Sequence, residues 1–279
     1  MKIFKRGNEI EISDISDFDL SRIFECGQCF RWKRDECGAY TGVAYGHAAR
    51  VHQIGDKVFL SCSDAEFEII WRNYFDLDRD YRFIRQQLCI DDFMKRATAF
   101  GAGIRILRQD KWEALCSFII SQNNNISRIK SIIDTLCREF GEIIPFGEKI
   151  LYTFPSVEKI ASVGIEKLGV INCGYRTKYI ADAAGKVADG KIDLDALAEY
   201  SPDATRAALK SIHGVGDKVA DCVMLFGLQK LDAFPVDVWM KRAVAMNYGP
   251  DFTPEIFSPY AGLAQQYIFH YVRSCYNDN

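Results

Sequence analysis

The pattern of hydrophobic and polar residues changes near residue 100. Before this point, short aromatic and β-branched runs are separated by glycine-containing turns, a pattern typical of antiparallel strands. The runs predicted as strands cover residues 30–33, 39–43, 50–54 and 57–62. From Asp64 to Tyr74 the apolar residues follow helical spacing instead, which predicts a helix that packs across the sheet.

After residue 103 helical spacing dominates nearly to the end of the chain. The predicted helices cover residues 112–119, 126–140, 156–161, 175–189, 194–200, 202–211, 218–227, 238–247 and 259–276. The expected fold class is therefore α+β. An N-terminal antiparallel β-sheet domain with helices is expected at residues 1–102, followed at residues 103–279 by an all-α domain pair. The all-α part should contain a helix-hairpin-helix motif at about residues 205–227.

Composition narrows the protein class without revealing the function. Hydrophobic residues make up 48% of the 279 residues and charged residues 26%, which excludes a disordered chain. We expect no membrane helix, because no apolar run approaches the roughly 20 residues that one requires. The N-terminal residues do not resemble a secretion signal, so we expect an intracellular protein whose ten cysteines stay reduced and form no disulfides. A net charge of -3 gives no hint of nucleic-acid binding, which must rest on specific motifs.

One short segment combines a tight turn with two flanking helices. Gly214-Val215-Gly216 separates the predicted helices, and the second helix begins with free N–H groups that suit a phosphate. A Gly-x-Gly turn alone more often marks an ordinary corner between helices. Lys218 lies at the start of the second helix, and Asp237 is placed like the N-cap of the next one. Taken singly, Lys218 is better explained as a surface charge and Asp237 as a helix cap. The combination of the hairpin, the lysine and the aspartate indicates one functional site.

This segment resembles the helix-hairpin-helix DNA glycosylase superfamily and, within it, the 8-oxoguanine DNA glycosylase family. Four blocks in the family's order carry the resemblance: residues 27–32, residues 107–128, residues 174–179, and the pair 214–222 with 235–238. Two departures stand out. Trp239 replaces a histidine of the animal members, which puts a phosphate contact there in doubt. The four-cysteine cluster of the iron–sulfur relatives is missing, since Cys275 is the only cysteine after Cys222.

The resemblance implies a bifunctional enzyme, a DNA N-glycosylase and a DNA-(apurinic or apyrimidinic site) lyase. Lys218 would attack C1′ of the damaged nucleotide and form a Schiff base, while Asp237 stabilises the positive charge that develops on the sugar. β-Elimination of the 3′ phosphate would follow. No catalytic metal or cofactor is expected. The Cys26-x-x-Cys29 spacing is not read as a zinc or redox site, because no second Cys/His pair follows it.

Further site residues follow from the resemblance. The lesion base would be recognised by the Gly27 carbonyl, which can accept the N7–H that distinguishes 8-oxoguanine from guanine. Around that base the family places Cys222, Gln265 and Phe269. On sequence alone, Phe269 is nearly as well explained as a core aromatic and Gln265 as a surface residue of an amphipathic helix.

A second group of residues would contact the DNA around the lesion. Asn123 would enter the vacated space, Tyr175 would wedge beside it, and Arg128 and Arg176 would bind the orphaned cytosine, although both arginines could instead bind phosphates. Asn123 could equally belong to a polar turn. The hairpin residues Gly214, Val215, Gly216 and Val219 would hold a DNA phosphate, and their carbonyls could hold a monovalent or calcium ion.

The expected partner is duplex DNA containing 8-oxoguanine, preferably opposite cytosine, and we expect a monomer. Such an enzyme would act in the cytoplasm or nucleoid of a prokaryote, or in the nucleus of a eukaryote. Two alternatives remain open at this point. One is a non-catalytic helix-hairpin-helix module that binds DNA without cutting it, against which Lys218 and Asp237 argue. The other is an alkylated-base glycosylase that uses Asp237 alone and leaves Lys218 without a role.

Overall fold

The structure, a computed structural model, describes residues 1–277 and the side chains of residues 1–275. By the density of internal contacts the chain forms two compact units, each built from separate stretches of sequence. The first unit comprises Met1–Gln28, Val51–Arg108 and Lys230–Asn279, and the second comprises Cys29–Arg50 and Gln109–Gln229. The predicted domain boundary between residues 102 and 103 differs from this division, because the chain from Lys230 onward belongs to the first unit.

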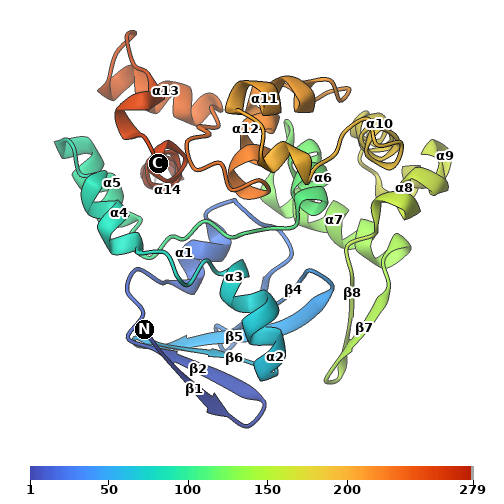
Figure 1. Cartoon of the computed structure of the whole chain (residues 1–279), viewed down its shortest axis with the longest axis horizontal. Helices are drawn as coiled ribbons and strands as arrows, with labels where there is room; N and C mark the ends of the chain where they lie inside the picture. Colours follow the sequence, from blue (N-terminus) through green and yellow to red (C-terminus); the bar gives the residue numbers. More distant parts are fainter. Residues whose placement is uncertain (278–279) are drawn as a thin grey trace. The chain divides into compact units, whose positions relative to one another are not determined.

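Six antiparallel strands form the main sheet, in the order β1-β2-β6-β5-β4-β3 (Figure 1). The strands are β1 Lys2–Arg6, β2 Glu9–Ser13, β3 Lys33–Arg34, β4 Tyr40–Ala44, β5 His47–Ile54 and β6 Lys57–Leu60. β2 is buried on both faces: Ile10 and Ile12 are each 1% exposed and Glu11 is 4% exposed. Glu11 between them forms ion pairs with Arg6 and Lys57.

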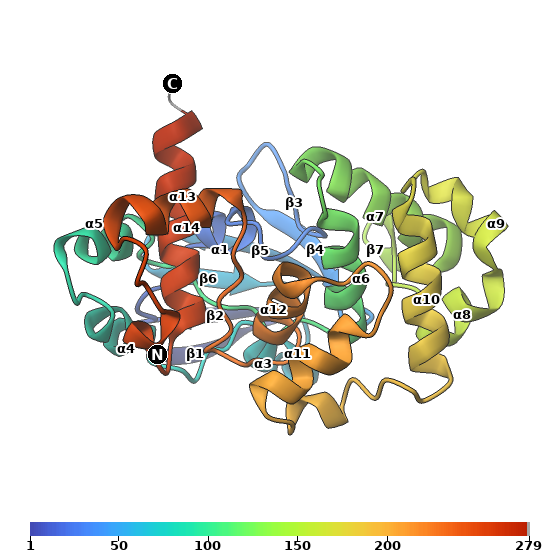
Figure 2. The ribbon, with the colours of Figure 1, turned by 90° about the horizontal axis from the view of Figure 1, so that it is seen from above.

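The helices of the first unit include the C-terminal helix. They are α1 Leu20–Glu25, α2 Asp64–Glu66, a π-helical turn Phe67–Trp71, α3 Arg72–Tyr74, α4 Tyr81–Gln87, α5 Asp92–Phe100, α13 Val238–Asn247 and α14 Ala261–Asn277. α14 packs against α5 and α13, as Figure 2 shows from above. Side-chain caps fix where several of these helices begin; the Asp80 carboxylate, for example, accepts the Phe83 N–H (3.0 Å) at the start of α4.

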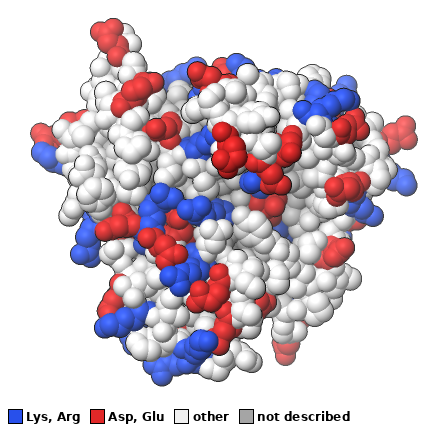
Figure 3. Space-filling model, in the orientation of Figure 1, with Lys and Arg blue, Asp and Glu red and all other residues white. Residues whose placement is uncertain are grey.

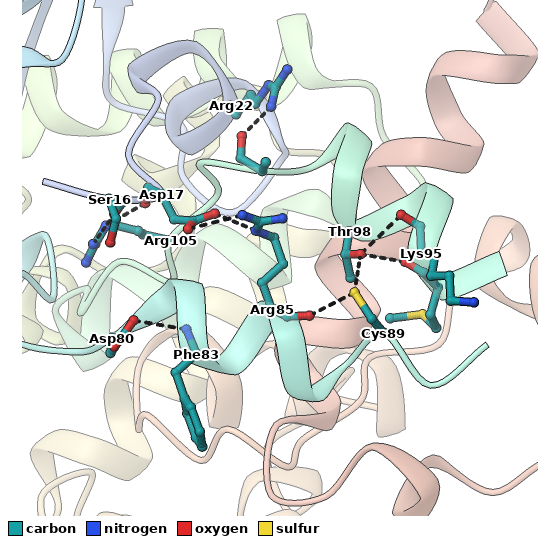
Figure 4. Close-up of polar contacts among 12 residues, drawn as sticks. Ser16, Asp17, Arg22, Asp80, Phe83, Arg85, Cys89, Lys95, Thr98 and Arg105 are labelled. Carbon is teal, nitrogen blue, oxygen red and sulfur yellow. Dashed lines mark hydrogen bonds and ion pairs between the residues drawn. The ribbon is translucent and has the colours of Figure 1, made fainter. Parts of the chain in front are cut away.

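A buried arginine joins loops of the first unit. The guanidinium of Arg105 donates to the carbonyls of Ser16 (2.9 Å), Asp17 (2.9 Å) and Asp76 (2.8 Å), as seen in part in Figure 4. It lies over the Tyr81 ring, 4.5 Å from the centroid. Because a buried charge must be matched by polar partners, this arrangement holds residues 104–108 in one position.

The second unit is built around a largely buried helix, α6 Lys111–Ser121, against which α7, α10 and α12 pack. Its other elements are α7 Ile126–Phe140, β7 Ile143–Phe146, β8 Lys149–Tyr152, α8 Val157–Val163, α9 Ile165–Leu168, α10 Arg176–Ala188, α11 Pro202–Lys210 and α12 Asp217–Phe226. Short 3₁₀ turns cover Gly169–Ile171 and Ala196–Ala198 here, and Pro254–Phe257 in the first unit.

Several predicted elements differ from the structure. The β1–β2 hairpin was not predicted, and the antiparallel β7–β8 hairpin interrupts the region predicted as helical. The helix predicted at 194–200 is only a 3₁₀ turn. The strand predicted at 30–33 is reduced to β3, because Phe30 packs on the Phe118 ring and Trp32 fills the space beside Gly42. These two aromatic residues therefore pack in the core and do not form part of a strand.

No helix among the described residues has the length and hydrophobicity needed to cross a bilayer.

Candidate DNA-binding and catalytic site

The predicted hairpin joins α11 to α12 and depends on one glycine above all. Gly214 has φ +82°, and a Cβ there would lie 2.3 Å from the ring of Tyr179 on α10. Gly216 is the N-cap of α12 with φ −99°, and a Cβ there would meet nothing within 4 Å. The conformation of Gly216 is therefore open to other residues, and within the hairpin the strict requirement for glycine falls on Gly214.

α10 supports the hairpin through further contacts. The Asp182 carboxylate accepts the His213 N–H (2.7 Å), and Lys186 Nζ donates to the Ser211 carbonyl (2.6 Å). The two helices of the motif are joined by an ion pair between Arg206 Nε and Asp221 Oδ1 (2.9 Å). Burial raises the pKa of Asp221, and Arg206 opposes this rise. Asp221 thus has a structural role within the motif.

The first turn of α12 has the geometry of a phosphate site. Its first intrahelical bond runs from Ala220 N–H to the Gly216 carbonyl (3.0 Å), so the N–H groups of residues 217–219 have no acceptor within the helix. The side chains of Val215 and Val219 are buried, at 6% and 3% exposed. These two valines can therefore meet a phosphate only through their backbone.

We predict that Gly214→Ala weakens binding to damaged and undamaged duplexes alike. The added methyl would strain the left-handed backbone and displace the Tyr179 ring, which moves the N–H groups that contact a phosphate without specifying sequence. Dissociation constants for both duplexes, from fluorescence anisotropy, measure the effect. Gly190→Ala is the matched control, because Gly190 has φ +69° with open space around it. A loss confined to lesion DNA would contradict the assignment.

Lys218 lies in the first turn of α12 and is held by the end of α6. Its Nζ is 3.4 Å from Ser121 Oγ and 5.4 Å from the centroid of the Phe118 ring. Ser121 Oγ donates its hydrogen to the Phe118 carbonyl (2.8 Å). The lone pairs of Ser121 Oγ can therefore accept a hydrogen bond from Lys218. Cys222, 3% exposed, follows one turn later on α12. Sequence reasoning missed Ser121, because no local pattern relates it to a lysine 97 positions away.

The residues predicted for the DNA gap lie at the α6–α7 turn and the start of α10. Asn123 is exposed and has φ +51°. Arg176 is only 6% exposed, and its guanidinium donates to the carbonyls of Gln122 (Nε, 2.7 Å) and Asn123 (Nη2, 3.0 Å). It also stacks on the ring of Tyr175, at 4.5 Å, and Tyr175 is 50% exposed.

The two predicted cytosine-binding arginines therefore differ. Arg128 is exposed on the first turn of α7, where the Asn125 side chain caps its N–H (2.9 Å). Arg176 already uses its donors on the turn that carries Asn123. Only Arg128 presents its guanidinium at the surface in this structure.

The first unit holds the other predicted site residues. Gly27 has φ +89°, and a Cβ there would lie 3.6 Å from Cε1 of Phe269, so the two residues are neighbours. Gln265 precedes Phe269 by one turn of α14, is 4% exposed, and accepts a hydrogen bond from the Gln266 side chain (2.8 Å). The alternative that Gln265 is a surface residue is therefore wrong.

Asp237 is the N-cap of α13, as predicted. Its Oδ1 accepts the Met240 N–H at 2.8 Å, and its side chain is half-buried. Trp239, at the position where the resemblance breaks, lies under the Arg242 guanidinium, 5.6 Å from the ring centroid. Asp237 belongs to the first unit and Lys218 to the second, so their joint action stays a prediction.

Two further observations concern metal-binding groups and surface charge. Among the described residues no group of three or more His, Cys, Asp or Glu side chains could hold a metal ion. Cys26 and Cys29 are buried, and burial raises the pKa of Cys26 to about 11, which favours an inert thiol. Basic and acidic side chains are interspersed on the face shown in Figure 3. The net charge of -3 likewise gives no general attraction to DNA, so we expect binding to depend on local donors such as the N–H groups at the start of α12.

Comparisons with known proteins agree with this arrangement. Residues 11–115 match the model of the 8-oxoguanine DNA glycosylase N-terminal domain, and residues 116–256 match that of the HhH-GPD superfamily base excision DNA repair proteins. An N-glycosylase/DNA lyase of Saccharomyces cerevisiae is 34% identical over 84% of this chain and 69% of the relative. N-glycosylase/DNA lyase OGG1 of Arabidopsis thaliana is 31% identical over 91% of this chain and 77% of the relative.

A solved structure extends the likeness to the whole fold. The 8-oxoguanine glycosylase/lyase of Clostridium acetobutylicum, in complex with double-stranded DNA containing cytosine opposite 8-oxoG, is 37% identical. It superposes with a TM-score of 0.94 over 99% of both chains. Together with the hairpin, the lysine on α12 and the capping aspartate, these matches establish that the chain belongs to the 8-oxoguanine DNA glycosylase family of the HhH-GPD superfamily.

Proposed function

We propose that this chain excises 8-oxoguanine from duplex DNA through a Schiff base on Lys218, prefers cytosine opposite the lesion, and then cleaves the strand by β-elimination. The observation that carries the proposal is the placement of Lys218. It follows a hairpin suited to a phosphate, and its amine is held between the Ser121 hydroxyl and the Phe118 ring. A surface lysine with a purely electrostatic role would not need this support.

The chemistry begins with a nucleotide turned out of the duplex, at a cost of a few kcal/mol that inserted side chains offset. As the bond from C1′ to the base breaks, the sugar acquires positive charge, which the Asp237 carboxylate stabilises. The Nζ lone pair of Lys218 forms the new bond to C1′ while the base leaves with the bonding electrons. Opening of the sugar ring then gives the imine.

The imine enables the second step. Removal of a C2′ proton is favoured because the electrons pass into the protonated imine, and the 3′ phosphate then leaves from C3′. Water hydrolyses the imine and releases Lys218 unchanged. No metal or organic cofactor takes part. A monovalent or calcium ion at the hairpin would rest on backbone carbonyls, because no acidic or thiol cluster is available among the described residues.

Selection of the lesion uses residues of the first unit. The Gly27 carbonyl accepts the N7–H of 8-oxoguanine, a donor that guanine lacks. Phe269, beside Gly27, stacks on the extruded base, and the Gln265 amide binds its Watson–Crick edge. Cys222 flanks the opposite face of the base. An enzyme with this substrate acts wherever the cell keeps its DNA, in the nucleoid or the nucleus.

A cleavage panel tests the proposal. Duplexes containing 8-oxoguanine or an alkylated base are incubated with the native chain, with and without borohydride. We expect excision of 8-oxoguanine, strand cleavage and a covalent adduct trapped by borohydride. Excision of alkylated bases without an adduct would identify the enzyme that uses Asp237 alone, and binding without excision or adduct would identify a non-catalytic module.

We predict that Arg128→Met narrows the preference for cytosine opposite the lesion. An orphaned cytosine presents N3 and O2 as adjacent acceptors, which the planar guanidinium can bind together, and adenine offers no such pair. Loss of this contact should cost about 1–3 kcal/mol of discrimination, through slower action on the cytosine pair. Single-turnover excision with cytosine or adenine opposite measures the ratio. Lys130→Met, which removes a charge from the same helix, is the control. If the ratio of the cytosine rate to the adenine rate is unchanged in Arg128→Met, Arg128 binds a phosphate rather than the cytosine.

A further inference from the structure

The residue after Gly27 is a fully buried glutamine whose hydrogen bonds tie this loop to two other segments. Gln28 is 0% exposed. Its Nε2 donates to the carbonyls of Ile23 (2.9 Å) and Arg105 (2.7 Å), and its Oε1 accepts the Leu107 N–H (2.9 Å). A buried amide is costly unless it is paired, and here both ends of the amide bind backbone groups.

The segments that Gln28 binds are themselves fixed. Ile23 belongs to α1, and its carbonyl, near the end of that helix, gains a donor from Gln28. Arg105 uses its backbone carbonyl for Gln28 and its guanidinium for three carbonyls elsewhere in the first unit, two of which, those of Ser16 and Asp17, are drawn in Figure 4. Gln28 therefore anchors the loop to a segment that the buried Arg105 guanidinium ties to three other carbonyls.

We infer that Gln28 is a positioning residue that fixes the Gly27 carbonyl for discrimination between 8-oxoguanine and guanine. 8-Oxoguanine carries an N7–H donor where guanine has an acceptor. The Gly27 carbonyl must therefore be held in one position if it is to bind 8-oxoguanine and reject guanine. Gly27 has a left-handed backbone and no side chain to hold it, and the adjacent Gln28 supplies the missing constraint. This inference rests on the proposed function of Gly27.

The experiment compares two reactions of the same enzyme. Excision of 8-oxoguanine requires the base to be read, whereas cleavage at a preformed abasic site requires Lys218 but offers no N7–H. In Gln28→Met, which keeps the length of the side chain without its hydrogen bonds, we expect excision opposite cytosine to fall about 10²-fold. A displacement of about 1 Å can cost this much. Abasic-site cleavage should stay within about twofold of native.

Two further variants make the test specific. In Gln28→Glu the buried carboxyl is expected to be protonated, so it keeps one donor and one acceptor and should give an intermediate rate. The matched control is Gln53→Met. Gln53 also spans backbone groups around the start of α1, with Oε1 accepting the Leu20 N–H (3.1 Å) and Nε2 donating to the Phe18 carbonyl (3.0 Å). Its loss should lower the melting temperature without changing the ratio of excision to abasic-site cleavage.

Equal losses of both reactions in Gln28→Met would show a merely structural role, and native rates for both would show no role; either result overturns the inference. If Gln28→Met does not fold, Gln28→Glu must show the selective loss. A native chain that fails to excise 8-oxoguanine would instead refute the proposed function of the site, whatever the variants do.

Discussion

Lys218→Gln should abolish base excision, abasic-site cleavage and borohydride trapping, while lesion-DNA binding stays close to native. The amine forms a covalent bond only as the reaction proceeds, so its removal affects the transition state far more than the ground state. Glutamine retains a donor at nearly the same reach and can still contact the Ser121 hydroxyl, so the packing over Phe118 should change little. The measurements are single-turnover excision, adduct formation and anisotropy binding.

The control for Lys218→Gln is a lysine that the mechanism does not use. Lys210 lies at the end of α11 and pairs with Asp217 (2.6 Å), so Lys210→Gln removes the same charge close to the same hairpin. It should slow neither excision nor trapping, apart from a small change in the salt dependence of binding. Undiminished excision by Lys218→Gln would exclude this lysine as the nucleophile.

The sequence predicts best where local signals mark the ends of an element. The helices at 126–140 and 238–247 have the bounds predicted, since Asn125 and Asp237 cap their first turns and Gly141 follows the first helix. The β7–β8 hairpin also has a local signal, two short apolar runs around Gly147, but it is short and lies within a region of helical spacing. The terminal strand β1 is exposed along most of its length and therefore lacks the apolar alternation that marks a strand.

Contacts between distant segments could not be predicted in this way. The sequence identified Lys218, Gly27 and Arg176, but not the groups that hold them, because the Ser121 hydroxyl, the Gln28 amide and the Gln122 carbonyl are brought into place by tertiary packing. The different requirements at Gly214 and Gly216 could not be predicted for the same reason. Both glycines have the same turn signal, and they are distinguished by the positive φ of Gly214 and by the Tyr179 ring beside it.

Asp237→Asn should lower excision by about 10²–10³-fold, the range seen when one preorganised electrostatic group is removed from an active site, without unfolding the chain. The cap and the charge can be separated here. Asp237 Oδ1 accepts the Met240 N–H (2.8 Å), and asparagine caps a helix about as well as aspartate, so α13 should keep its first turn. What disappears is the negative charge that offsets the positive charge developing on the sugar.

Two further variants complete the test. Asp237→Ala removes both cap and charge, so it should match Asp237→Asn in excision while losing about 1 kcal/mol of unfolding free energy. Asp80→Asn makes the same exchange at the N-cap of α4, where the carboxylate binds the Phe83 N–H, and should leave excision unchanged. Single-turnover rates and thermal unfolding of all three variants separate the effects. A folded Asp237→Asn variant with near-native excision would remove this carboxylate from the mechanism and leave the sugar cation to be stabilised by the DNA phosphates.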